Sequence, residues 1–280
     1  STPQADVQGV HVAAGAQPAL RSYVFALERL RYKRFSISLV AEEKGKLLGL
    51  VSARRGSGPT AWLVDHLVFR GDDDAPLCEL LEAVSAYAAR RGAERLLLRL
   101  PDEWYVQKLA CQSGFAASSQ SLLLTLPGRS LLYKEGPALN MRLRQPVDDH
   151  ALFRLYNACT PAEVRFKMGM TLQQWKDAEE PKTRQTSEMV IEREGDVVGW
   201  LRLDYHRGQT KVRTVVQSNG GVDMPSLVAY VVSSGGRKGV FWEVPEYQAD
   251  LHLLLERMGF EVSGCYRLMV NSLAPMVREP

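Results

Sequence analysis

Residues 95–101 read Arg-Leu-Leu-Leu-Arg-Leu-Pro, and residues 239–245 read Gly-Val-Phe-Trp-Glu-Val-Pro. Each stretch is a short apolar run that ends at a proline, which is typical of a buried strand. A helical stretch follows in both places and ends at a Gly-Phe pair, at 114–115 in one case and at 259–260 in the other. The same order at nearly the same spacing indicates an internal repeat, which predicts two copies of one domain.

Length and composition fit two globular domains. The chain has 280 residues, of which 45% are hydrophobic and 24% are charged, and its formal net charge is +3. Neither half has a strong excess of basic residues, so we expect no nucleic-acid partner. No apolar run approaches the roughly 18 residues of a membrane span, and no signal peptide is visible, so we expect no membrane partner.

The cysteines bear on metal binding and on the compartment. They stand far apart, at positions 78, 111, 159 and 265, with no Cys-x-x-Cys motif and no histidine at ligand spacing. This pattern argues against a disulfide framework and against a zinc site. A reducing compartment is the default for such a chain, so we expect a cytoplasmic protein without a metal.

Hydrophobic periodicity predicts the same order of elements in both halves. In the first half the predicted strands are 36–41, 47–53, 61–69, 95–100 and 121–126, and the predicted helices are 17–34, 76–91 and 102–112. In the second half the predicted strands are 141–144, 188–193, 197–203, 211–217, 239–244 and 265–271, and the predicted helices are 148–158, a short one around Trp175, 224–234 and 246–258. A capping box at Thr171 opens the short helix.

Two further features set the domain boundaries and the fold class. Residues 127–137 contain two prolines and two glycines and are the predicted linker, so the expected domains are 1–128 and 138–280. The predicted hairpins of the two halves also match, with glycines at 45 and 49 in one and at 195 and 199 in the other. Buried strands joined by helices indicate an α/β fold, with a mixed sheet covered on both faces.

This order of elements resembles the GNAT acyltransferase superfamily. The resemblance rests on residues 40–49 as the second-to-third strand hairpin, on 65–69 as the fourth strand, on 80–92 as the third helix and its exit, and on the two Gly-Phe pairs as the exits of the fourth helices. It covers nearly the whole chain as a tandem pair, similar to mycothiol-synthase-like proteins with one degraded half. It implies two GNAT-like domains, each with a mixed, mostly antiparallel sheet flanked by helices.

The resemblance also implies a cofactor and a chemistry. In the superfamily, a loop with the pattern Gln/Arg-x-x-Gly-x-Gly/Ala binds the pyrophosphate of acetyl-CoA through backbone N–H groups at a helix N-terminus. The separation of the fourth and fifth strands takes the pantetheine arm. A carboxylate or a water chain removes a proton from the amine, and often a tyrosine protonates the leaving thiolate.

In the first half, residues 70–75 read Arg-Gly-Asp-Asp-Asp-Ala where the loop belongs. Three aspartates lie where phosphates would dock, and like charges roughly 4 Å apart repel by about 4 kcal/mol at an effective dielectric constant of 20. We therefore interpret this cofactor loop as degraded, with the acidic residues favouring the helix N-terminus that follows.

In the second half, Gln217 and Gly220 fit the family's pattern, and Val222 stands where its last glycine or alanine belongs. With Gly221, these residues are the candidate cofactor-binding residues, because adjacent glycines can form a backbone nest for a phosphate. The alternative is an ordinary turn in which Asp223 caps the next helix.

Glu243 is the candidate catalytic base. It stands near the end of a buried strand, where burial would raise the pKa of a carboxyl group toward a useful value. The alternative is a strand-end charge that reaches solvent. The tyrosine of the family has no counterpart, because Ala110 and Leu255 occupy its positions, and Tyr247 lies too near a helix start to be carried over.

Three functions follow as hypotheses. The first is an acyl-CoA-dependent N-acyltransferase whose second half binds acetyl-CoA and acylates a small-molecule amine or a peptide. The second is a catalytically inactive GNAT-fold protein that serves in binding or as a scaffold, with both phosphate loops degraded. The third is a transferase that uses aminoacyl-tRNA, against which the near-neutral halves argue. The sequence predicts no oligomeric state.

Overall fold

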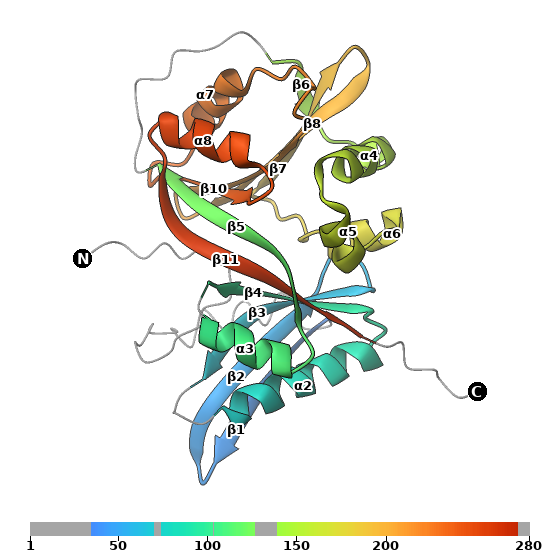
Figure 1. Ribbon diagram of the computed structural model, residues 1–280, viewed down its shortest axis with the longest axis vertical. Coiled ribbons are helices and arrows are strands. Elements are labelled where there is room, and N and C mark those ends of the chain that lie inside the picture. The colour runs from blue at the N-terminus through green and yellow to red at the C-terminus, as the bar shows by residue number, and fades with distance from the viewer. Residues whose placement is uncertain (1–34, 70–73, 103, 127–138, 274–280) are drawn as a thin grey trace. The chain divides into compact units, whose positions relative to one another are not determined.

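The computed structural model describes residues 35–69, 74–102, 104–126 and 139–273 (Figure 1). The predicted helix 17–34, most of the loop 70–75 and the predicted linker lie outside these ranges. Within them the chain is an α/β protein, as predicted, and none of its helices is long and apolar enough to cross a membrane.

The chain divides into two compact units that exchange segments. Of the residues that the structure describes, those up to 118, those from 167 to 181 and those from 267 to 273 form the first unit, and those from 119 to 166 and from 182 to 266 form the second unit. The predicted ranges 1–128 and 138–280 are continuous in the sequence, whereas these units are not. The first unit contains two segments from the second half of the sequence, and the second unit contains residues 119–126 from the first half.

The first unit is built on strands β1 to β4. Its elements are β1 (Ser36–Glu43), β2 (Lys46–Arg55), β3 (Ala61–Phe69), α2 (Ala75–Arg90), β4 (Arg95–Pro101) and α3 (Trp104–Gln112). Strands β1, β2 and β3 pair in antiparallel fashion, β3 and β4 pair in parallel, and β11 (Glu261–Ser272) lies next to β4. Helix α2 packs against β1 and β2, and α3 packs against α2. All the strands and helices predicted from 36 to 112 are confirmed within a few residues.

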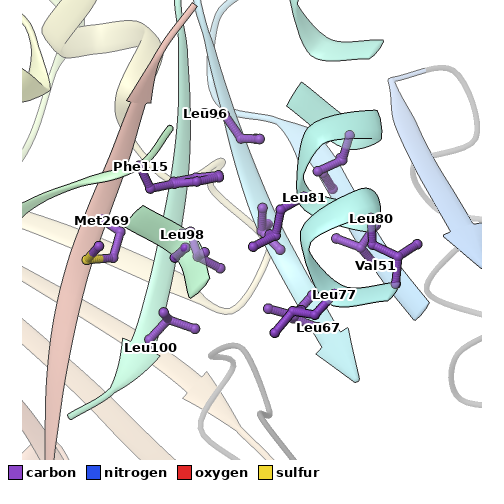
Figure 2. Packing of buried hydrophobic residues seen from close by; sticks show 14 of the residues in the cluster. Val51, Leu67, Leu77, Leu80, Leu81, Leu96, Leu98, Leu100, Phe115 and Met269 are labelled. Atoms are coloured by element: carbon purple, nitrogen blue, oxygen red, sulfur yellow. The ribbon is translucent and has the colours of Figure 1, made fainter. Parts of the chain in front are cut away.

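The core of the first unit lies between α2 and the sheet (Figure 2). Leu77, Leu81 and other residues at helical spacing give α2 one apolar face, and every second residue of β4 from Leu96 onward faces it. Met269 of β11 and Phe115 belong to the same cluster and are 0% and 3% exposed. A strand from the end of the chain is thus part of the core formed by residues 51–115.

The second unit has the longer sheet. Its strands are β6 (Met141–Leu143), β7 (Thr186–Arg193), β8 (Asp196–His206), β9 (Gln209–Val216), β10 (Val240–Pro245) and the parts of β5 (Ala116–Leu126) and β11 that belong to this unit. The order is β6-β7-β8-β9-β10-β5-β11. Only β9 and β10 pair in parallel among the pairings from β6 to β5, so the sheet is mixed and mostly antiparallel, as the resemblance implied.

Helices cover the sheet of the second unit, as hydrophobic patterning requires. The remaining described helices are η1 (Pro146–Asp148), α4 (Asp149–Cys159), α5 (Ala162–Met168), α6 (Leu172–Ala178), α7 (Met224–Ser234) and α8 (Ala249–Arg257). Of these, α6 belongs to the first unit, where it contacts β3. Helices α7 and α8 bury their apolar faces around Trp242, and α4 packs against β8 and β9. The capping box of α6 is confirmed, because the backbone N–H of Gln174 donates to Thr171 Oγ1 at 3.1 Å. Helix α5 was not predicted.

Backbone detail confirms the repeat. In the hairpin β1–β2 the two-residue turn is Lys44-Gly45, with φ values of 50° and 78°, and in β7–β8 it is Glu194-Gly195, with 53° and 88°. Two positive φ values in a two-residue turn match the right-handed twist of the strands and favour glycine. Each hairpin also has a bulge, after Ala41 and after Ile191. The two hairpins therefore repeat in conformation as well as in sequence.

The prediction that strand 121–126 closes the first half is wrong. It is the end of the longer strand β5, and it pairs antiparallel with β10, from Ser121 with Pro245 to Leu126 with Val240. An apolar strand has the same sequence pattern whichever sheet accepts it, so periodicity alone could not assign this one.

Candidate functional site

In the second unit, the parallel strands β9 and β10 stop pairing before either strand ends. Their ladder runs from Thr210 with Val240 to Arg213 with Glu243. Both strands continue, β9 as far as residue 216 and β10 as far as residue 245. The first unit repeats this feature, because the ladder of β3 and β4 ends at residues 63 and 97, well before those strands end. Each unit thus has one pair of parallel strands whose ladder ends early.

Glu243 occupies the last paired position of the β9–β10 ladder. Its side chain is 16% exposed, and its Oε2 lies 3.2 Å from Nζ of Lys211 on β9, which is 12% exposed. Burial disfavours the ionised carboxylate, whereas the ammonium group beside it favours that form. The ion pair with Lys211 engages this charge within the protein, and the side chain keeps some contact with solvent. A catalytic role for Glu243 stays a prediction.

Glu243 belongs to a charged face of the sheet. Glu188 on β7, 6% exposed, accepts hydrogen bonds from Arg144 and from Arg202 at 3.1 and 3.3 Å. Arg202 also donates to Asp204 at 2.8 Å. Successive side chains of β8 point to opposite faces of the sheet. Arg202 and Asp204 therefore point away from the core around α7 and α8, which contains Leu201 and Leu203. Charges this deeply buried are tolerated because each has an opposite charge close by.

Tyr247, which lies too near a helix start to match the tyrosine of the family, is partly buried. Burial raises the pKa of its phenol, a hydrogen bond with the Thr160 side chain lowers it, and the charge of Glu243 raises it. The phenol is therefore close enough to Glu243 to feel its charge, and it stays protonated at neutral pH. The signal in the sequence was an aromatic residue two positions after the proline that ends β10.

The raised pKa of Tyr247 predicts a loss of stability in alkaline solution. Above pH 10 the phenol ionises readily in the unfolded chain but not in the folded one, so deprotonation favours unfolding as the pH rises. We expect the free energy of unfolding to fall less between pH 9.5 and 11 in Tyr247→Phe than in the wild type. Urea unfolding at several pH values measures this. Tyr266→Phe is the control, and equal slopes for Tyr247→Phe and the wild type would contradict the prediction.

The loop after β9 lines a pocket in the second unit. The pocket has a volume of about 450 Å³ and lies between one face of α4, the turn of the β7–β8 hairpin and the loop. Of the candidate cofactor-binding residues, Gln217 and Gly220 line it. The Gly220 amide donates to the Gln217 carbonyl at 2.9 Å, which closes a tight turn in the loop.

The other two candidate residues have different surroundings. Gly221 has a φ of +64°, which favours glycine, and a Cβ there would lie 1.2 Å from Nη1 of the flexible Arg193 side chain. Val222 packs partly buried against the hydrophobic core of the second unit. Asp223 precedes α7, and its carboxylate accepts a hydrogen bond from the Ser226 hydroxyl at 2.5 Å. Cofactor binding by these four loop residues stays a prediction.

The corresponding loop of the first unit is described only at Asp74, which precedes α2 and makes no side-chain capping bond. Two residues of β3, the strand before this loop, contact side chains of β2. Nδ1 of His66 lies 2.9 Å from Oγ of Ser52, and Asp65 accepts a hydrogen bond from Arg54 Nε at 2.8 Å. In the described ranges no cluster of three histidine, cysteine or acidic side chains could hold a metal ion.

Comparison with known proteins identifies the fold. A tandem GNAT protein from the clavulanic acid biosynthesis pathway aligns over 96% of this chain and 91% of its own, with a TM-score of 0.56 and 13% identity. A GCN5-related N-acetyltransferase from Sphaerobacter thermophilus aligns over 90% and 87%, with a TM-score of 0.54 and 16% identity. Another from Kribbella flavida aligns over 93% and 98%, with a TM-score of 0.53 and 13% identity. No protein-family model and no curated protein match the sequence.

The chain therefore has the fold of the GNAT acetyltransferases. More particularly, it has their tandem form, since the alignments cover nearly all of this chain and of each neighbour. The resemblance stated from the sequence is confirmed at the level of the fold. A likeness to mycothiol synthases stays a prediction, and at these low identities the activity is a matter for a proposal.

Proposed function

We propose that the protein is an acyl-CoA-dependent N-acyltransferase whose working site lies in the second unit. The observation that carries the proposal is the position of Glu243, a partly buried carboxylate at the point where the ladder of β9 and β10 ends. A carboxylate partly shielded from water, at the point where two parallel strands stop pairing, is in a position suited to a general base. The loop after β9 supports the same site, because it pairs a tight turn with a glycine of positive φ at the start of α7.

The residues present are compatible with acetyl-CoA. The amides of Gln217 and Gly220 donate to the carbonyls of Val198 and Gln217. The other backbone N–H groups of the loop as far as Val222 and the N-terminus of α7 would face the phosphates of acetyl-CoA. When bound, the cofactor supplies an acyl thioester. Glu243 would accept the proton that the attacking amine loses, and the protonated phenol of Tyr247 would return a proton to the thiolate that leaves. The acceptor is a small-molecule amine or a peptide.

Two contacts favour the second candidate function, a GNAT-fold binding protein without activity. The ion pair with Lys211 engages the carboxylate that the base would use. Gln248 also reaches from the start of α8 toward β9, with its Nε2 3.5 Å from the Thr214 carbonyl, one residue beyond the end of the ladder. A pantetheine arm bound between β9 and β10 would have to displace the Gln248 side chain.

Calorimetric titration with acetyl-CoA and with free CoA tests the proposed cofactor site. We expect micromolar binding at one site per chain, and we expect Gly220→Asp to weaken it by at least about tenfold. A Cβ at this position would lie 3.0 Å from the Gln217 carbonyl and from Val198, and the added carboxylate would repel phosphate.

Ser233→Asp is the matched control, since it adds the same charge to an exposed position in the last turn of α7. Its thermal stability and that of Gly220→Asp are compared with the wild type. Absence of binding up to millimolar concentration, which means a binding free energy weaker than about −4 kcal/mol, would refute the cofactor site and leave the binding-protein hypothesis.

A further inference from the structure

A row of four charged side chains crosses the sheet of the second unit. Glu188 of β7 lies opposite Arg202 of β8, which lies opposite Arg213 of β9. Arg213 lies opposite Glu243 of β10, and these two residues form the last pair of the parallel ladder. Cross-strand partners point to the same face of a sheet, so all four side chains share the face away from α7 and α8.

Two positive charges are neighbours in this row. Like charges directly opposite one another on adjacent strands destabilise a sheet, and Arg202 and Arg213 are such a pair. Asp204 offsets part of this repulsion. Its carboxylate accepts hydrogen bonds from Arg202 at 2.8 and 3.1 Å and lies 3.7 Å from Nη2 of Arg213. Asp204 is thus closer to Arg202 than to Arg213, and a second carboxylate beside Arg213 would reduce the repulsion further.

Arg213 also differs from Arg202 in its exposure to solvent. The Arg202 side chain is 4% exposed, whereas the Arg213 side chain is 23% exposed. A ligand can therefore reach the guanidinium group of Arg213 far more easily than that of Arg202. A guanidinium group binds a carboxylate through two parallel hydrogen bonds. Arg213 is thus placed to bind a carboxylate at the point where β9 and β10 stop pairing.

The charges around the end of the ladder narrow the class of ligand. They balance in number, because Arg202, Lys211 and Arg213 are basic and Glu188, Asp204 and Glu243 are acidic. A polyamine would meet the positive charges of Lys211 and Arg213 on both sides of Glu243, and a polyanion would meet Glu243 and Asp204. A small zwitterion, with one amine and one carboxylate, offers each kind of group a partner of opposite charge.

We propose that the acceptor of the second unit is an amino acid, with its carboxylate bound by Arg213 and its amine placed at Glu243. This inference rests on the proposed function and names the substrate class of the same site. Neighbouring strands lie about 4.8 Å apart, so one small molecule spans both side chains. In the transfer the free amine forms an amide bond in place of the thioester C–S bond, the sulfur keeps the electron pair of that bond, and Glu243 accepts the proton that the amine loses.

Steady-state kinetics with acetyl-CoA and two matched sets of acceptors, the standard L-amino acids and their α-carboxamides, tests the proposal. We expect kcat/KM for the preferred amino acid to exceed that for its carboxamide by about tenfold or more, because the carboxamide offers Arg213 no charge. The amine of a carboxamide loses its proton more easily, since no carboxylate stabilises its charged form. Intrinsic reactivity therefore cannot explain a preference for the amino acid.

Arg213→Met is expected to remove this preference. It should raise KM for the amino acid by about tenfold or more and leave the kinetics of the carboxamide nearly unchanged. Arg213→Lys keeps the charge and should recover part of the preference. Arg237→Met is the matched control, because this exposed arginine precedes β10, far along the strand from the end of the ladder. Thermal unfolding of each variant shows whether it is folded.

Calorimetric titration of the full chain with the same compounds, in the presence of free CoA, gives a readout that does not need acyl transfer. Acyl transfer without a preference for amino acids, or with a preference that persists in Arg213→Met, would overturn the inference and leave the proposed function standing. Arg213-dependent binding of an amino acid without acyl transfer would support the ligand class and refute the proposed function. Absence of both amino-acid binding and acyl transfer would overturn the inference.

Discussion

Asp177→Ala is expected to lower the free energy of unfolding of the first unit by about 3 kcal/mol, the largest effect on stability that we predict. The carboxylate is 2% exposed and joins α6 to the turn between β2 and β3. It accepts hydrogen bonds from the amide and the hydroxyl of Thr60, at 3.1 and 2.7 Å, and from Gln173 at 2.6 Å. Alanine leaves these partly buried donors without their acceptor, which costs more than the bonds themselves contribute.

A close contact between Asp177 and Gly58 allows a more specific test of this prediction. A Cβ on Gly58 would lie 1.7 Å from Oδ1 of Asp177, so Gly58→Ala alone should cost about 1–3 kcal/mol through overpacking. In the Asp177→Ala background the clash with the carboxylate disappears. The effects of the two substitutions should therefore not add, as expected for residues in direct contact.

Urea unfolding of the two single variants and the double variant gives the coupling. Glu82→Ala is the matched control, because it removes an exposed carboxylate from the middle of α2 in the same unit. Additive losses, or an Asp177→Ala variant as stable as the control, would show that residues 167–181 do not hold the first unit together in this way.

Glu243→Gln is expected to lower kcat by at least about 100-fold while leaving the affinity for CoA unchanged. Glutamine keeps the size of the side chain but cannot take a proton from an amine. The change also removes the charge that Lys211 pairs with, 3.2 Å away, so thermal unfolding must be measured beside the kinetics. An effect on kcat at unchanged affinity separates chemistry from binding.

Steady-state kinetics with acetyl-CoA and a panel of amines measures the effect of Glu243→Gln. The control is Glu261→Gln, an exposed glutamate at the start of β11. A Glu243→Gln variant with the kcat of the wild type would refute the role of Glu243 as the general base. A wild type that binds acetyl-CoA but acylates no amine or peptide would favour the binding-protein hypothesis instead.

The candidate residues of the loop were predicted from local sequence, whereas the other residues of the pocket come from elements distant in the chain. Gln217 and Gly220 were predicted because a short motif describes a local loop, and both line the pocket. Arg154 and Arg193 gave no such signal, because one lies on a helix and the other beside a hairpin turn, and only the fold brings both to one pocket. Lys211 was missed for the same reason, since its pairing with Glu243 depends on the register of two strands that α7 separates.

The sequence by itself determined the repeat and nearly every element. Apolar periodicity identified strands and helices, and paired glycines at 45 and 195 required the same two-residue turn in both halves, because local backbone sterics and local burial do not depend on the rest of the chain. Only the tertiary structure decided the exchange of segments, which places β11 next to β4 and Asp177 beside Gly58. The residues of a single strand or a short helix do not specify which unit it joins, so long-range packing assigns each one to its unit.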